Sequence, residues 1–166
     1  MIVAGGMAVI RGTANIHNWF RDFHVTPKFC RAHVDIGLCP SGALDAAMAF
    51  ADMLPPEVEI LTGHSLGGQI AAEIAGMRRA VRKPLTTLVT FDAPKAGGLQ
   101  LTNILADIEV RQYRFRDSPV TWWPIDFDHH VRVPLIDIGD RTFDPLEAHS
   151  ITRAADWMQT SSLQLV

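Results

Sequence analysis

The sequence lacks the features that mark membrane-spanning and nucleic-acid-binding chains. None of its apolar runs reaches the ~18 residues that a membrane-spanning helix needs. The formal net charge of -3 gives no electrostatic reason to bind nucleic acid. Hydrophobic residues make up 48% of the chain and charged residues 20%, which is the balance of a globular protein with a real core. We therefore expect no transmembrane segment and no nucleic-acid partner.

Cysteine is scarce, since Cys30 and Cys39 are the only two, and neither a C-x-x-C nor an H-E-x-x-H pattern occurs. No metal and no other cofactor is therefore predicted. Nine residues of extended chain span roughly 30 Å, whereas a disulfide needs Cα atoms within about 7 Å. If the segment from Cys30 to Ile36 is a strand, the two cysteines cannot pair, and we expect two semi-buried thiols.

A basic leader is also missing, because residues 1–6 carry no charged side chain and are too short for a signal peptide. The cytoplasm is therefore the default location, unless a signal was removed. The length of 166 residues predicts a single domain over residues 1–166, and no repeat, low-complexity segment or linker interrupts it.

Strand and helix patterns alternate along the chain, and the central strands are continuously apolar. The predicted strands are 7–11, 29–36, 58–62, 85–91, 110–115 and 131–138. The predicted helices are 16–23, 41–53, 66–81, 98–107 and 148–159. This alternation favours an α/β fold with a largely parallel sheet that helices cover on both faces.

The most informative segment is Gly63-His64-Ser65-Leu66-Gly67-Gly68, which contains the G-x-S-x-G pattern of a nucleophile elbow. The glycines are needed because Ser65 must sit on a sharp, strained turn with its hydroxyl exposed above the sheet. The pattern alone occurs by chance in roughly 5% of chains of this length. Here a strand pattern precedes it and a helical pattern follows it, which is the context that the motif requires.

A serine nucleophile needs a base, and the chain offers seven histidines: His17, His24, His33, His64, His129, His130 and His149. The order of the α/β-hydrolase triad, serine before acid before histidine, leaves the last three. We favour His149, which follows the turn-rich segment 140–145 and begins a predicted helix, as a displayed base should. His64 is expected to point to the opposite face, because strand side chains alternate.

The orienting acid should lie between Ser65 and His149, and the candidates are Asp92, Asp117, Asp126, Asp128 and Asp137. Asp117 follows the strand 110–115 directly, in a loop at the end of the sheet where sites of this fold class are built. Asp92 also follows a strand and is the main rival. The structural alternative for Asp117, which precedes Ser118-Pro119, is a turn or capping residue.

Two further features belong to the same end of the predicted sheet. An oxyanion hole would take one backbone N–H from Leu66 and a second from the segment Arg11-Gly12-Thr13, which closes the first strand. The segment 16–23 places Ile16, Trp19, Phe20 and Phe23 on one helical face. It is either a short helix packed on the core or a lid that covers an apolar substrate cleft.

In their order along the chain, several segments resemble the class 3 lipases, the fungal-type triacylglycerol lipase group of the α/β hydrolases. They are the oxyanion strand 9–13, the lid 18–23, the block 32–37, the elbow 62–68, the strand and loop 90–97, the acid segment 116–120 and the histidine segment 148–150. The resemblance runs over residues 7 to about 157. Many hydrolases share the elbow, whereas the ordered set is far more specific.

The resemblance implies an α/β-hydrolase fold and a lipase or esterase that acts on ester or lipid substrates. The apolar face of the expected lid favours action at a lipid interface. It implies Ser65 as nucleophile, His149 as general base and acid, and Asp117 as orienting acid. Thr13 and Leu66 would form the oxyanion hole. It also favours the lid interpretation of Ile16, Trp19, Phe20 and Phe23.

Two departures from the family pattern carry expectations of their own. Asp92 stands where the family usually has glycine, which puts a second carboxylate near the predicted site. The segment before the oxyanion strand is much shorter than in the family, so one or two edge strands should be missing, and a homodimer that covers the exposed edge is predicted. Trp122-Trp123-Pro124 is read equally well as acyl-pocket lining or as core.

The rival function from another class is a non-catalytic lipid- or partner-binding module that keeps the hydrolase fold. A thioesterase or an acyltransferase would share the serine chemistry and differ only in the leaving group or the acceptor. The sequence alone does not separate these from an ester hydrolase.

Overall fold

The computed structural model describes residues 1–12, 27–30, 35–122, 136–139, 142, 144, 147 and 149–162. Six of the described strands form one sheet in the order β1-β2-β5-β6-β7-β8. They are β1 (Ile2–Ala4), β2 (Met7–Ile10), β5 (Ile60–His64), β6 (Thr87–Phe91), β7 (Glu109–Phe115) and β8 (Ile136–Ile138). β1 runs antiparallel to β2, and all the other neighbouring pairs are parallel. The carboxyl ends of β2, β5, β6, β7 and β8 therefore share one edge of the sheet.

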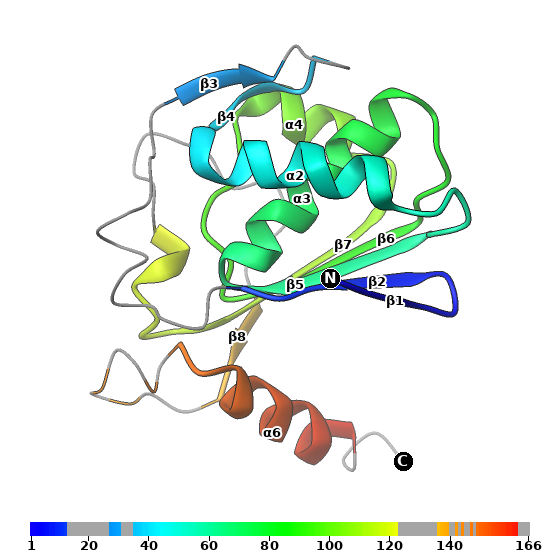
Figure 1. Ribbon diagram of the computed structural model, residues 1–166. Helices are drawn as coiled ribbons and strands as arrows, with labels where there is room; N and C mark the ends of the chain where they lie inside the picture. Colours follow the sequence, from blue (N-terminus) through cyan, green and yellow to red (C-terminus); the bar gives the residue numbers. More distant parts are fainter. Residues whose placement is uncertain are drawn as a thin grey trace.

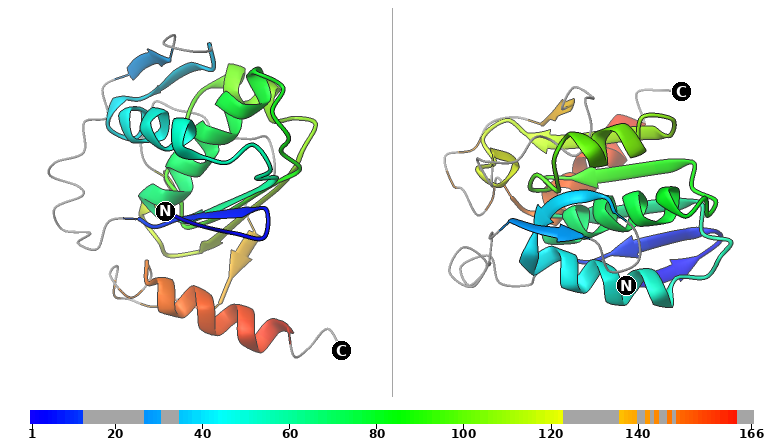
Figure 2. Two further views of the ribbon diagram at one scale, coloured as in Figure 1. Left: turned by 45° about the vertical axis from the view of Figure 1, so that its right-hand side comes forward. Right: turned by 90° about the horizontal axis from the view of Figure 1, so that it is seen from above.

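Helices cover both faces of this sheet, as the alternating pattern predicted. The described helices are α2 (Ser41–Met53), α3 (Leu66–Ala80), α4 (Leu99–Ile104), α6 (Ile151–Ser162) and the short 3-10 turn η1 (Val120–Trp122). Figure 1 shows α2, α3 and α4 on one face of the sheet and α6 on the opposite face. The left view of Figure 2 again shows α6 on the opposite side of the sheet from α2 and α3. The expected α/β architecture is thus confirmed.

The face under α3 holds the main core. In β2, Ala8 and Ile10 are buried, whereas Met7 and Val9 are each 38% exposed on the other face, so the strand alternates as a sheet strand must. α3 is buried along most of its length, because it packs against β5 on one side and α2 on the other. Gly76 brings α3 close to α4, since a Cβ there would lie 2.3 Å from a Leu101 methyl group.

A buried arginine fastens the end of α3 to the loops beside it. The Arg78 guanidinium is 1% exposed and donates hydrogen bonds to four backbone carbonyls, those of Pro55, Pro56, Val58 and Pro84. A buried cation is tolerated where hydrogen bonds compensate for its lost water, and here both terminal nitrogens of Arg78 donate to carbonyl oxygens. Arg78 therefore fastens the carboxyl end of α3 to the loops that lead into β5 and β6.

The predicted strand 29–36 is wrong. The chain instead forms an antiparallel pair from β3 (Pro27–Cys30) and β4 (Gly37–Pro40), with Pro27 opposite Pro40. The reversal ends at Gly37, whose φ of 89° lies in the left-handed region that favours glycine. The expectation that the cysteines lie far apart assumes an extended chain between them. That assumption fails, because β3 and β4 lie side by side and Lys28 is opposite Cys39. That the cysteines stay unpaired is still only a prediction.

Other element bounds differ less from the prediction. α2 has the predicted bounds, while α6 begins at Ile151 rather than Ala148, which leaves His149 in the loop before the helix. β1 was not predicted, because three residues are too few for a periodic pattern. Residues 131–135 of the last predicted strand lie outside the described residues. Within the described part of the chain, no helix is long and apolar enough to cross a membrane.

Candidate active site

Ser65 lies on the sharp turn between β5 and α3, with φ 57° and ψ -133°. The neighbouring glycines are required by direct contact. A Cβ on Gly63 would lie 2.3 Å from the Gly67 carbonyl oxygen, and one on Gly67 would lie 2.2 Å from the Ile10 carbonyl oxygen. The G-x-S-x-G spacing is therefore needed because β2, β5 and the start of α3 approach one another so closely. The predicted strand–turn–helix context of the motif is present.

His149 is the histidine that the fold brings to this serine. Its Nε2 lies 2.7 Å from Ser65 Oγ, although 84 residues separate them in the sequence. Both side chains are buried, with 3% of Ser65 and 5% of His149 exposed. The loop that carries His149 turns into α6, and Ser150 N–H donates to the Glu147 carbonyl at 3.0 Å just before the helix. A serine and a histidine at hydrogen-bond distance form the core of a nucleophilic site.

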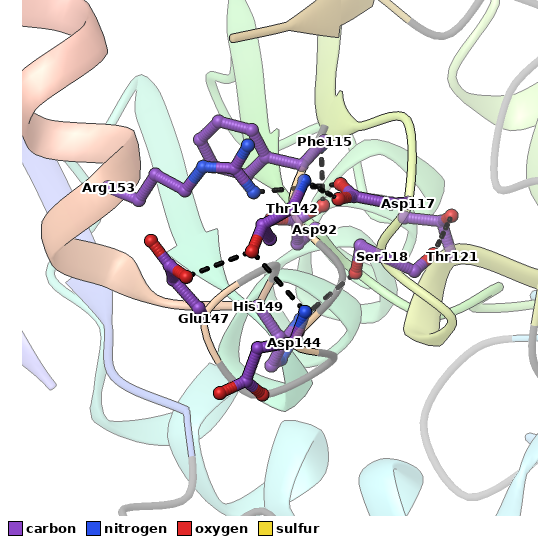
Figure 3. Close-up of polar contacts among 10 residues, drawn as sticks. All are labelled: Asp92, Phe115, Asp117, Ser118, Thr121, Thr142, Asp144, Glu147, His149 and Arg153. Carbon is purple, nitrogen blue, oxygen red and sulfur yellow. Dashed lines mark hydrogen bonds and ion pairs between the residues drawn. The ribbon is translucent and has the colours of Figure 1, made fainter. Parts of the chain in front are cut away.

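The second ring nitrogen of His149 contacts a hydroxyl group. Nδ1 lies 3.3 Å from Ser118 Oγ, in the loop that follows β7, as Figure 3 shows. If Nε2 accepts the Ser65 proton, Nδ1 must carry the ring proton and donate it toward Ser118. Burial, with a smaller contribution from His64, lowers the pKa of His149 to about 3. The ring is therefore neutral at neutral pH and holds a lone pair for a proton.

Asp117, the predicted orienting acid, precedes Ser118, and among the described residues no contact joins its carboxylate to the His149 ring. Its carboxylate accepts a hydrogen bond from the Thr142 backbone N–H, and Arg153 Nη1 of α6 lies 3.6 Å from its Oδ1 (Figure 3). In this arrangement Asp117 ties the loop ahead of His149 and the first turns of α6 to the end of β7. The hydroxyl of Ser118, its neighbour in sequence, is the group that contacts Nδ1.

Asp92, the rival acid, follows β6 and is 1% exposed. Its Oδ1 accepts the Phe115 backbone N–H at 2.9 Å, and its φ of 44° explains why glycine suits this position. The pKa of Asp92 rises to about 7, mainly because burial disfavours the charged form. Hydrogen bonds with the Phe115 backbone and the Ser118 side chain and the charge of Arg153 oppose that rise, whereas the charge of Asp117 adds to it.

The prediction that His64 points away from the site is wrong. Its ring lies 4.8 Å, centroid to centroid, from the ring of His149 at an angle of 33°. The two-residue alternation of β5 stops at the elbow, because Ser65 leaves the extended conformation. Burial lowers the pKa of His64 to about 4, opposed by a hydrogen bond with the His149 backbone. Neither this contact nor the contact of Ser118 with His149 has a signal in the sequence, because both depend on which strands are neighbours.

Comparison with known proteins identifies the family. The family model for Lipase (class 3) matches residues 7–119, well over half of the chain. This chain belongs to the class 3 lipase family. The family resemblance inferred from the sequence is thus confirmed.

Comparison with a single relative shows what share of that protein's length this chain spans. The "Secreted mono- and diacylglycerol lipase 1" of Fusarium solani is 29% identical over 149 residues, which are 82% of this chain and 41% of that protein. This chain therefore spans less than half the length of that relative.

Solved lipase structures show the fold. The mono- and diacylglycerol lipase from Aspergillus oryzae superposes with a TM-score of 0.65 at 20% identity, over 84% of this chain and 56% of that one. The Lip2 lipase from Yarrowia lipolytica gives 0.64 at 19% identity, over 86% and 59%. The predicted α/β-hydrolase fold of this member of the class 3 lipase family is confirmed.

One of the two predicted oxyanion donors, Leu66, lies directly after Ser65. Leu66 is the first residue of α3, and the first amides of a helix have no partner within the helix. The loop after β2 comes close to Ser65, since a Cβ on Gly12 would lie 2.6 Å from the His64 carbonyl oxygen and 3.0 Å from Ser65 Cβ. Thr13 itself lies outside the described residues, so its part in the oxyanion hole stays a prediction.

A cavity of about 710 Å³ opens beside Ser65 and His149. Apart from Ser65 and His149, its described lining is mostly apolar and includes Ile2, Val9, Phe91, Ile151 and Met158. Trp122 is not part of that lining and is 55% exposed, with the Arg114 guanidinium 4.9 Å from its ring centroid. The core interpretation of Trp122 is therefore wrong. Trp123, Pro124 and the predicted lid residues Ile16, Trp19, Phe20 and Phe23 lie outside the described residues.

Proposed function

We propose that this chain hydrolyses carboxylic esters of lipid-like substrates through an acyl-enzyme formed on Ser65. The observation that carries the proposal is the 2.7 Å contact between Ser65 Oγ and His149 Nε2 on a strained elbow. The buried, neutral His149 ring is suited to accept the serine proton, and the elbow holds the hydroxyl at the amino end of α3. Because this chain spans 41% of its relative, the activity of the whole relative is carried over only as a proposal.

The reaction runs in two halves. Ser65 Oγ attacks the ester carbonyl carbon while His149 Nε2 takes the hydroxyl proton, and the oxyanion is held by the backbone N–H groups of Leu66 and Thr13. The tetrahedral intermediate then releases the alcohol, which leaves with the proton from His149. Water attacks the acyl-enzyme in the same way, and the carboxylic acid departs as Ser65 regains its proton.

Asp117 is the orienting acid of this proposal, and Asp92 is the second candidate. Asp117 holds the loop ahead of His149 through Thr142 and Arg153, and its charge would stabilise the imidazolium that forms during the reaction. Asp92 is favoured by its burial beside Ser118, whose hydroxyl contacts Nδ1 of His149. In that variant the Ser118 hydroxyl accepts from Nδ1 and donates to the carboxylate.

The proposed substrates are esters with an apolar acyl chain, at a lipid surface. The apolar lining of the cavity beside Ser65 supports this, as does the name of the Fusarium solani relative, a mono- and diacylglycerol lipase. A lid over 16–23 and a single domain over 1–166 are parts of the same proposal. A homodimer remains a prediction, and a monomer whose sedimentation does not change with concentration would contradict it.

The test is hydrolysis of p-nitrophenyl esters from acetate to palmitate by wild type and Ser65→Ala in parallel. We expect Ser65→Ala to lose activity by roughly 10⁴-fold or more while its circular dichroism and melting temperature stay close to wild type. A chain-length optimum beyond butyrate would indicate a lipase rather than a short-chain esterase. Equal activity in both proteins would end the assignment of Ser65. A folded wild type that neither hydrolyses esters nor reacts with a fluorophosphonate would point to a binding module instead.

A further inference from the structure

Three side chains from separate segments meet behind the nucleophile. His64 ends β5, Asp92 follows β6, and His149 precedes α6. Each offers one nitrogen or carboxylate oxygen, and these three atoms all lie within 4.8 Å of one another. The hydrolytic mechanism uses His149, but it has no task for His64.

Two of the polar atoms in this cluster are buried and have no hydrogen-bond partner among the described residues, namely His64 Nε2 and Asp92 Oδ2. The His64 ring lies 4.8 Å, centroid to centroid, from the ring of His149. In Asp92 the other carboxylate oxygen is anchored, because Oδ1 accepts the Phe115 N–H at 2.9 Å. Metal ligands are typically held in this way, with the free atom turned toward the ion and the other fixed by a backbone group.

The donor types suit a metal as well. Imidazole nitrogens and carboxylate oxygens are both common ligands of transition-metal ions. Asp92 is the one acidic side chain of the three, and a bound divalent cation would favour its ionised form.

We propose that His64, Asp92 and His149 form a binding site for Zn²⁺ or a similar transition-metal ion, and that occupation of this site reversibly inhibits the enzyme. Two imidazoles and one carboxylate are ligands that zinc takes, whereas Mg²⁺ and Ca²⁺ prefer oxygen alone. Tetrahedral zinc ligands lie about 3.4 Å apart, so rotation of the side chains has to close the widest pair by about 1 to 1.5 Å.

Inhibition follows from the lone pairs of His149, and this part of the inference rests on the proposed function. A neutral imidazole has one nitrogen with a lone pair. When that lone pair accepts the Ser65 proton, the ring acts as the base. When it coordinates a metal ion, it cannot accept a proton, whichever nitrogen makes the bond. Metal binding and catalysis are therefore mutually exclusive at His149.

Binding is tested without activity, on Ser65→Ala protein, by equilibrium dialysis against Zn²⁺ and by the visible spectrum of added Co²⁺. We expect one ion per chain and the strong absorption of tetrahedral Co²⁺. His64→Gln in the same background should weaken binding by more than the roughly 10- to 100-fold that loss of a ligand's supporting hydrogen bond causes. Asp92→Asn gives a second ligand variant should His64→Gln fail to fold.

The matched control is the double variant His129→Gln/His130→Gln, which removes the only adjacent histidine pair in the sequence. It should bind Zn²⁺ like its parent. Zn²⁺ binding that is lost in this control but kept in His64→Gln would overturn the proposal. A Ser65→Ala protein that binds no Zn²⁺ at about 1 mM would overturn it as well.

Inhibition is then measured on wild type, by ester hydrolysis and by fluorophosphonate labelling, with Zn²⁺ and after excess EDTA. We expect both rates to fall at least tenfold at saturating Zn²⁺ and to return with EDTA, and the midpoint to match the Kd from dialysis. Bound Zn²⁺ that leaves labelling and hydrolysis unchanged would overturn the inhibitory role. A chain without any Ser65-dependent activity would remove the proposed function but leave the dialysis result standing.

Discussion

The two faces of the sheet are built differently. Under α3 lies a large, mainly aliphatic core that reaches from Ala8 in β2 to Val110 in β7. Under α6 lies a small, aromatic cluster around Phe91, Phe115 and Ile138. The α6 layer does not bury the exposed side of β2, where Met7 and Val9 remain 38% exposed. One face is therefore a scaffold, and the other is a thinner layer beside an open cavity.

The two groups of the proposed catalytic pair come one from each layer. The scaffold holds Ser65, because the elbow is fixed by the contacts of Gly63 and Gly67 with backbone. The α6 layer holds His149, through a few contacts of Arg153, which lies 3.6 Å from Asp117 and whose guanidinium is 4.0 Å from the Phe115 ring centroid. The stability of the fold and the position of His149 therefore depend on different contacts. Substitutions in one layer should change the free energy of unfolding, and substitutions in the other should change kcat.

After Ser65→Ala, the largest effect is expected from the carboxylates at the boundary of the α6 layer. Asp117→Asn should lower kcat by about 10³-fold or more, because it removes the charge that stabilises the imidazolium and loosens the loop ahead of His149. Asp92→Asn should lower kcat much less, since an amide oxygen can still accept the Phe115 N–H. Steady-state kinetics with an activated ester measure both. The reverse order, together with a matching loss in Ser118→Ala, would assign the role to Asp92.

The next largest effect separates the two cores. Ile74→Ala removes a fully buried side chain from α3 and should lower the free energy of unfolding by about 3 kcal/mol, with kcat per folded molecule unchanged. Trp157→Ala, from the partly buried α6 side, should destabilise by about half as much and lower kcat several-fold. Urea unfolding and active-site titration measure these. Equal losses of kcat in both variants would show that the faces are not independent.

Two arginines give a smaller, matched comparison. Arg78→Met should destabilise by about 2 kcal/mol and spare kcat, because it leaves the carbonyls that hold the end of α3 without their buried donor. Arg153→Met should change stability by less than about 1 kcal/mol, as weak ion pairs do, while kcat falls several-fold through the His149 loop. Thermal melts and steady-state kinetics on the same samples measure the stability and the kcat of both variants. Arg78→Met with a larger kcat loss than Arg153→Met would contradict the division.

The smallest effect is a pH dependence inside the scaffold. Glu73 of α3 is buried, with Gln69 Nε2 3.4 Å from its carboxylate, and burial raises its pKa well above the ordinary 4.5. The folded state then binds this proton more tightly than the unfolded chain, so the contribution of Glu73 to stability falls as pH rises above 4.5. Glu73→Gln cannot titrate and should melt higher than wild type at pH 8, with the difference shrinking toward pH 4.5. A difference that stays constant with pH would refute this.

Sequence patterns predicted well wherever the signal is local. The elbow, α2 and the apolar strands β5, β6 and β7 follow from neighbouring residues, because periodicity and glycine spacing act within one turn or strand. The predicted strand 29–36 was wrong, because an apolar run does not show whether the chain continues or reverses. The chain reverses between β3 and β4, and Gly37, with its positive φ, begins β4. His149 was found through chain order and loop context, and its ring does meet Ser65.

The sequence by itself determined the family, the α/β fold and the serine that sits on the elbow, since a strained turn needs particular residues at particular spacings. Tertiary structure alone decided which groups surround His149. His64, Asp92 and Ser118 come from the ends of three different strands, and parallel pairing gathers those ends at one edge of the sheet. No spacing in the sequence encodes that meeting, because it depends on strand order and register rather than on neighbouring residues.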